Sequence, residues 1–119
     1  AETADLHLTL GDLYRQASRF DAAIVEYSRW MSAHQGDART VNALFGRCRA
    51  RALVGVDLDK ALADCNRALN LAPNAAGALQ TRAIVRFKSG DADHAIADYD
   101  AALAILPKDA RFFDGCGRA

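Results

Sequence analysis

Histidines and cysteines are the side chains of this sequence best suited to metal binding or nucleophilic catalysis, but their spacing favours neither. They are His7, His34, His94, Cys48, Cys65 and Cys116. No two histidines lie within one helical turn of each other, and no cysteines show the Cys-x-x-Cys spacing of zinc sites. The sequence also lacks a Gly-x-Ser-x-Gly motif and a phosphate-binding P-loop. We therefore expect no catalytic, cofactor-binding or metal-binding residues and a non-enzymatic protein.

The three cysteines are an odd number, which argues against a designed disulfide framework. We expect them to be small buried apolar residues. The alternative is a disulfide between Cys48 and Cys65, which lie on helices that the sequence predicts to be paired. Unpaired cysteines favour a reducing compartment, whereas a start at Ala1 is typical of a cleaved signal or a fragment. Cytoplasmic and periplasmic locations both stay open.

The composition is that of a soluble globular domain, with 51% hydrophobic and 25% charged residues in 119. Fifteen basic and fifteen acidic residues cancel, so no net field attracts nucleic acid or an anionic membrane. No apolar run reaches the roughly 20 residues that a bilayer span needs. We expect neither nucleic-acid binding nor membrane insertion.

Two segments of the chain, 57–73 and 91–107, are copies of one helix. Ala-Leu-Ala-Asp-Cys-Asn-Arg-Ala-Leu at 61–69 matches Ala-Ile-Ala-Asp-Tyr-Asp-Ala-Ala-Leu at 95–103, and each copy ends at a proline, Pro73 or Pro107. The offset of 34 residues is typical of stacked helix–turn–helix repeats. Helical periodicity continues over the rest of the chain without a strand-like alternation, which predicts an all-α fold.

The first unit carries Leu10-Gly11, Tyr14, Ala23 and Tyr27, followed in later units by the closing prolines. This pattern resembles the tetratricopeptide repeat family. The resemblance implies one domain over residues 1–119, a right-handed α-solenoid with repeats at about 4–37, 41–75 and 76–109 and a partial repeat at 110–119. The chain departs from the pattern at four positions. Gln35 stands in place of the closing proline and Cys65 in place of the aromatic residue, and Arg51 and Arg86 replace the tyrosine of the first helix.

Two packing features are also expected. Trp30 stands where later units carry Ala68 and Ala102, and about three extra residues follow it around 38–40. We expect its ring to fill a wider gap between the first two units. Arg47 and Asp64 occupy the same relative positions as Arg82 and Asp98, so we expect each arginine to reach a carboxylate in its own or an adjacent unit.

In the resembled family the first helices line a concave groove that binds peptides. The matching positions here, our candidate peptide-binding groove, are Leu8, Asp12, Asn42, Phe45, Arg49, Gln80, Ile84 and Phe87. Asp5, Arg15, Lys88, Arg111, Asp114 and Arg118 extend this surface. Some family members grip a C-terminal carboxylate with a lysine and asparagine clamp. Its slots here hold Leu8, Asp12, Gly46 and Thr81, so chaperone-tail recognition is disfavoured.

We therefore expect an interaction scaffold that binds a peptide or an extended segment of a partner protein. The alternative is a self-associating module, a homo-oligomer formed through an uncapped C-terminal end near Phe112 and Phe113, or a fragment of a larger protein. A hydrolase or transferase is a third hypothesis, which no residue pattern in the sequence supports.

Overall fold

The structure, a computed structural model, describes the backbone of residues 2–105 and the side chains from Leu6 to Ile105. The described part holds six helices and no strand, as an all-α fold requires. The helices are α1 (Glu2–Gln16), α2 (Phe20–Ala33), α3 (Thr40–Val54), α4 (Leu58–Leu71), α5 (Ala76–Lys88) and α6 (Ala92–Ile105). The expected partial repeat at 110–119, and with it Arg111, Asp114, Arg118 and Cys116, lies outside the described residues, as does the side chain of Asp5.

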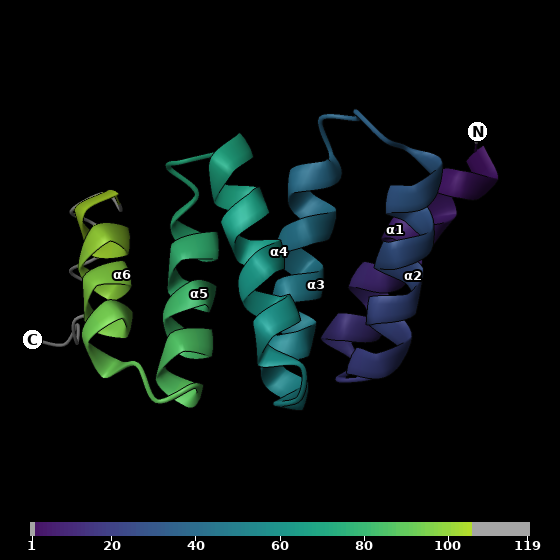
Figure 1. Cartoon of the computed structure of the whole chain (residues 1–119). Coiled ribbons are helices and arrows are strands. Elements are labelled where there is room, and N and C mark those ends of the chain that lie inside the picture. The colour runs from purple at the N-terminus through teal and green to yellow at the C-terminus, as the bar shows by residue number, and fades with distance from the viewer. Residues whose placement is uncertain (1, 106–119) are drawn as a thin grey trace, which may run out of the picture.

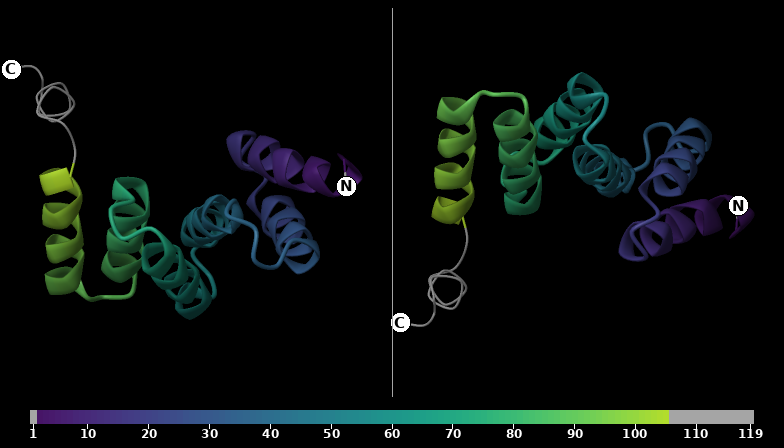
Figure 2. Two further views of the ribbon diagram at one scale, coloured as in Figure 1. Left: turned by 90° about the horizontal axis from the view of Figure 1, so that it is seen from above. Right: turned by 90° about the horizontal axis from the view of Figure 1, so that it is seen from below.

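Consecutive helices pair into three hairpins, α1–α2, α3–α4 and α5–α6, which stack in chain order into a curved helical solenoid (Figures 1 and 2). The first helix of each hairpin also packs on the second helix of the hairpin before it, and α3 contacts both α1 and α5. The first helices thus form a continuous layer, and the solenoid presents that layer as one surface.

Small residues let the helices approach. Ala23, Ala61 and Ala95 occupy equivalent positions on the second helices and are buried. The turns inside the later two hairpins contain Gly55 and Gly90, whose φ angles of 83° and 90° place them in the left-handed region that glycine adopts without strain. The Gly55 N–H donates to the Arg51 carbonyl oxygen and so closes the end of α3.

Trp30 fills the junction between the first two hairpins, as expected from the sequence. Its side chain is fully buried beside Tyr27 and Ala43. The His34 ring stacks on the indole with the ring centroids 4.5 Å apart, and the Arg39 guanidinium lies 5.4 Å from the indole centroid. The indole Nε1 has no hydrogen-bond partner within the described part of the chain. The ring therefore stabilises the junction through its packing.

No helix between residues 2 and 105 combines the length and the apolar character needed to cross a lipid bilayer.

Because the Trp30 side chain contributes packing and its indole N–H has no described hydrogen-bond partner, two different substitutions should lower stability by different amounts. Trp30→Ala should lower the free energy of unfolding by about 3–5 kcal/mol through the cavity that it leaves. Trp30→Phe keeps most of the ring and removes an N–H that has no partner, so its loss should be clearly smaller. Urea titrations followed by far-ultraviolet circular dichroism measure both, and equal losses would contradict this account.

Candidate functional site

The eight candidate groove residues all lie on the first helices α1, α3 and α5, but their exposure differs. Asn42, Gln80 and Phe87 are exposed, and Phe87 is the most exposed large hydrophobic residue that the structure describes, at 67%. Asp12 and Arg49 are half-buried. The layer of first helices therefore presents polar side chains around one prominent aromatic ring.

The other apolar candidates partly belong to the core. The Phe45 ring packs over Gly77 at the start of α5, where a methyl group on the glycine would lie 3.0 Å from the ring. Ile84 and Leu8 are half-buried against two of the core clusters. These three residues link neighbouring helices and expose only part of their side chains. Phe87 is thus the candidate whose side chain is largely free to meet a partner.

Asp12 is held by its own hairpin. The Tyr27 hydroxyl donates to Asp12 Oδ1 at 2.5 Å and accepts from Arg15 Nε at 3.1 Å. The Tyr27 side chain is fully buried, and this burial, with the hydrogen bond to Asp12 next in importance, raises the pKa of Tyr27 from 10.0 to about 12. One carboxylate oxygen of Asp12 is therefore hydrogen-bonded within the hairpin, while 45% of the side-chain surface stays exposed.

The slots of the carboxylate clamp carry no cation in this structure. Gly46 lies directly under the Tyr27 ring, and a methyl group there would be 2.5 Å from it. Thr81 is buried and donates to the Gly77 carbonyl oxygen at 2.9 Å. Both positions serve helix packing, so a side chain long enough to grip a carboxylate has no room there.

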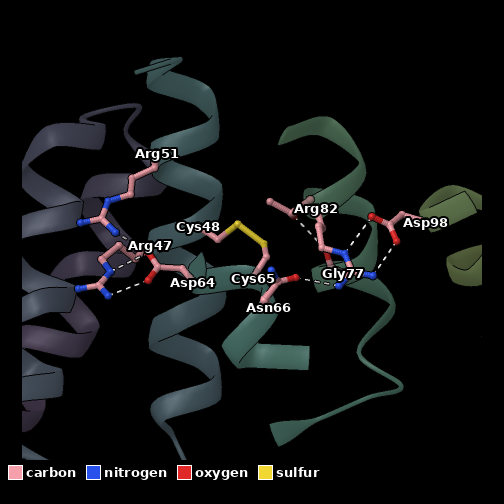
Figure 3. The surroundings of a disulfide bond; sticks show 10 residues. Arg47, Cys48, Arg51, Asp64, Cys65, Asn66, Gly77, Arg82 and Asp98 are labelled. Atoms are coloured by element: carbon pink, nitrogen blue, oxygen red, sulfur yellow. Dashed lines mark hydrogen bonds and ion pairs between the residues drawn. A yellow bond between two sulfur atoms is a disulfide. The ribbon is translucent and has the colours of Figure 1, made fainter. Parts of the chain in front are cut away.

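An ion-pair network joins the helices of the second hairpin (Figure 3). Arg47 donates to both oxygens of Asp64 through Nε and Nη2, at 2.8 and 2.7 Å, and Arg51 Nη1 donates to the same carboxylate at 2.7 Å. Arg47 Nη1 also donates to Ser28 of the hairpin before it, at 2.9 Å. The Asp64 side chain is only 5% exposed, so two cations share one buried carboxylate.

The third hairpin repeats this network. Arg82 donates to both oxygens of Asp98, Arg86 donates to Asp98 Oδ2, and Arg82 Nη1 reaches Asn66 of the preceding hairpin. We expected each arginine to reach a carboxylate in its own or an adjacent unit, and the structure shows the one in its own unit. The second arginine of each set, Arg51 or Arg86, was not expected to pair with the carboxylate; it follows the first arginine by one helical turn. That i, i+4 spacing, present in both first helices, was the available signal.

Cys48 and Cys65 form a disulfide that joins α3 to α4, with their Cα atoms 5.6 Å apart (Figure 3). This corrects the expectation that the cysteines are unpaired; the expected burial of these two is confirmed. The bridge stands at the position where the first hairpin brings Gly11 against the Tyr27 ring. At such a close approach two facing cysteines replace a glycine and an aromatic ring.

The described residues contain no group of three or more histidine, cysteine, aspartate or glutamate side chains that could hold a metal ion. The exposed pair of His94 and Asp91 is joined by a hydrogen bond of 2.7 Å.

Comparison with known proteins identifies the repeat. The sequence model of the tetratricopeptide repeat matches residues 48–112, more than half of the chain. The chain belongs to the tetratricopeptide repeat family. No curated protein matches the sequence.

Solved structures of tetratricopeptide repeat domains have the same fold. The first such domain of Spaghetti (RPAP3), bound to the HSP90 peptide SRMEEVD, is 25% identical with a TM-score of 0.78, over 90% of this chain and 82% of that one. The first domain of human RPAP3 is 26% identical with a TM-score of 0.76, over 87% and 79%. The domain of Arabidopsis OM64 shares 19% identity with a TM-score of 0.79, over 89% and 84%, and shows the fold alone.

The raised pKa of Tyr27 predicts an alkaline limit to stability. Because the folded state favours the neutral phenol, its contribution is complete below pH 10 and is lost as the pH rises from 10 towards 12. Tyr27→Phe should remove this component of the pH dependence. Titration of tyrosinate absorbance, with circular dichroism recorded alongside, measures it. The difference in tyrosinate absorbance between the wild type and Tyr27→Phe reports the ionisation of Tyr27. If its midpoint lies near pH 10 while the protein is still folded, the prediction is wrong.

Proposed function

We propose that this chain is a non-enzymatic interaction module that binds an extended segment of a partner protein along α1, α3 and α5. The observation that carries the proposal is the exposed ring of Phe87 on the layer of first helices, within a surface of polar groove residues. Exposed aromatic rings beside polar side chains are typical of interface hot spots. The solved relative that holds an HSP90 peptide supports peptide binding as the mode of action.

The chemistry of the groove indicates the kind of segment. Phe87 offers an apolar contact, Asn42 and Gln80 offer amide hydrogen bonds, and Asp12 and Arg49 carry opposite charges on different helices. We infer a partner segment with one apolar anchor and charges of both signs. The filled clamp slots at Gly46 and Thr81 argue against a segment that is held by its terminal carboxylate.

Peptides selected on the immobilised protein from a random library provide the test. Phe87→Ala should weaken their binding at least tenfold, because truncating a hot-spot aromatic residue costs about 2 kcal/mol or more. Ile96→Ala is the matched control, since Ile96 is similarly exposed at 58% but lies on the second helix α6. Fluorescence anisotropy measures the affinities. Equal affinity of Phe87→Ala and the wild type would contradict the proposal.

Self-association is the second candidate function, and an apolar stripe on α6 favours it. Ile96, Tyr99 and Leu103 are all exposed and follow one another at helical spacing. The two variants above separate the candidates. Under self-association Ile96→Ala lowers the mass measured by light scattering and Phe87→Ala does not, whereas a monomeric wild type removes this alternative.

We also propose that the chain works in an oxidising compartment, because a buried disulfide joins the helices of its second repeat. Such bonds are rare where glutathione and thioredoxin keep thiols reduced. Rapid alkylation of free thiols in the native host, followed by mass spectrometry, should leave Cys48 and Cys65 unlabelled. Labelling of both cysteines under native conditions would place the protein in a reducing compartment.

A further inference from the structure

A polar pocket lies between the second helices α2 and α4, with α3 beneath it. Its volume is about 400 Å³, and it is lined by Ser28, Met31, Ser32, Gln35, Gly36, Thr40, Arg47 and Arg67. None of the eight candidate groove residues is among them. This oxyanion pocket, as we name it, is therefore separate from the surface proposed above, and its role does not depend on that function.

The charge of the oxyanion pocket is positive. Arg47 and Arg67 line it, and its lining residues include no acidic side chain. Arg47 is paired with Asp64, but Arg51 shares the same carboxylate, so this group of three keeps one net positive charge. Arg67 is exposed and has no hydrogen-bond or ion-pair partner among the described side chains. Its guanidinium is therefore available to an anion.

Hydroxyl groups complete the lining. Thr40 Oγ1 is buried and makes no hydrogen bond to any described residue. Ser28 already donates to the Ile24 carbonyl oxygen at 2.8 Å and accepts from Arg47, so Thr40 and Ser32 are the lining hydroxyls left to donate. A buried hydroxyl without a partner costs free energy, and an acceptor atom of a ligand would satisfy it.

A second cavity of about 350 Å³ adjoins the first and shares Gly36, Thr40 and Arg67 with it. Its remaining lining is Asp37, whose carboxylate accepts hydrogen bonds from the Arg39 guanidinium, and the aliphatic side chains of Ala38, Val41 and Leu71. A polar, positively charged cavity thus continues into a partly apolar one, with Arg67 and Thr40 between them. Both volumes exceed that of a free inorganic anion, so the two cavities together have room for an organic molecule.

We propose that these two cavities bind an organic phosphate, with its phosphate group in the oxyanion pocket and its apolar part beside Val41 and Leu71. Arginine binds phosphate oxygens through two parallel N–H groups, and Arg67 is free to do so. Thr40 donates a further hydrogen bond to the same group. The phosphate is carried either by a small molecule or by a phosphorylated side chain, which present the same chemistry to the pocket.

The pocket is specific to the junction between the first two repeats. The position of Arg67 is Ala101 in the third repeat, which removes the free cation. Ala23 and Ala61 are 38 residues apart, whereas Ala61 and Ala95 are 34 apart, so most of the extra chain falls within the junction that forms the pocket. The feature is therefore a departure from the repeat and does not follow from its periodicity.

Calorimetric titration with phenyl phosphate tests the proposal, with inorganic phosphate and a short phosphotyrosine peptide as further probes. Phenyl phosphate should bind more tightly than inorganic phosphate because it also fills the apolar cavity. Arg67→Ala should weaken phenyl phosphate binding about tenfold, and Arg67→Lys less. Arg29→Ala is the matched control, since Arg29 holds the same position in the first repeat and its side chain is 62% exposed; its affinity should equal that of the wild type.

Thr40→Val supplies a second, nearly isosteric variant, which should also weaken binding while leaving the helical circular dichroism unchanged. Tighter binding of the peptide than of phenyl phosphate, with the same loss in Arg67→Ala, supports the pocket and identifies a phosphorylated side chain as the source. No heat of binding from any of the three probes at millimolar concentration would overturn the proposal. Equal weakening by Arg29→Ala and Arg67→Ala would also overturn it, because it would show attraction to the surface in general.

Discussion

The close approach of two helices at one equivalent position of the first two hairpins is the constraint on which the rest of the solenoid depends. In the first hairpin Gly11 leaves room for the Tyr27 ring, and Tyr27 also fills the space above Gly46 of the next hairpin. One aromatic ring thus packs within its own repeat and against the following one. In the second hairpin Cys48 and Cys65 form a disulfide at the same position. A covalent bond in one hairpin and a van der Waals contact in the other thus hold the two helices at the same close approach.

The close packing of the two helices in a hairpin also determines where the ion pairs form. With the helices held together, Asp64 and Asp98 are buried between first and second helices and must be compensated, because an unpaired buried carboxylate costs several kcal/mol. Each receives two arginines, and one of these also donates to the preceding hairpin, through Ser28 or Asn66. The hydrogen bonds therefore fix the orientation of one repeat relative to the next as well as the pairing within a repeat.

Most features that were predicted correctly from the sequence rest on positions that recur along the chain, although the single Trp30 was also placed and the recurring Arg51 and Arg86 were not. The all-α solenoid and the pairs of Arg47 with Asp64 and Arg82 with Asp98 follow from positions that repeat along the chain. The disulfide was not favoured, because an odd cysteine count says nothing about which helix faces meet. The half-burial of Phe45 depends on Gly77 in a neighbouring helix, a contact between units that single-repeat patterns do not contain.

Recurring positions are occupied by residues that hold the stack, so side chains available to a ligand stand where the repeats differ. Phe87 and Arg67 illustrate this. Phe87 is exposed and lies one residue before the end of α5 at Lys88. Lys88 Nζ donates a hydrogen bond to the Ala52 carbonyl oxygen of α3. Arg67 corresponds to Arg29 in the first repeat and to Ala101 in the third, and it lies beside the lengthened junction. Both side chains are exposed, so the fold does not use them for packing, and the binding proposed for each rests on the residues that surround it.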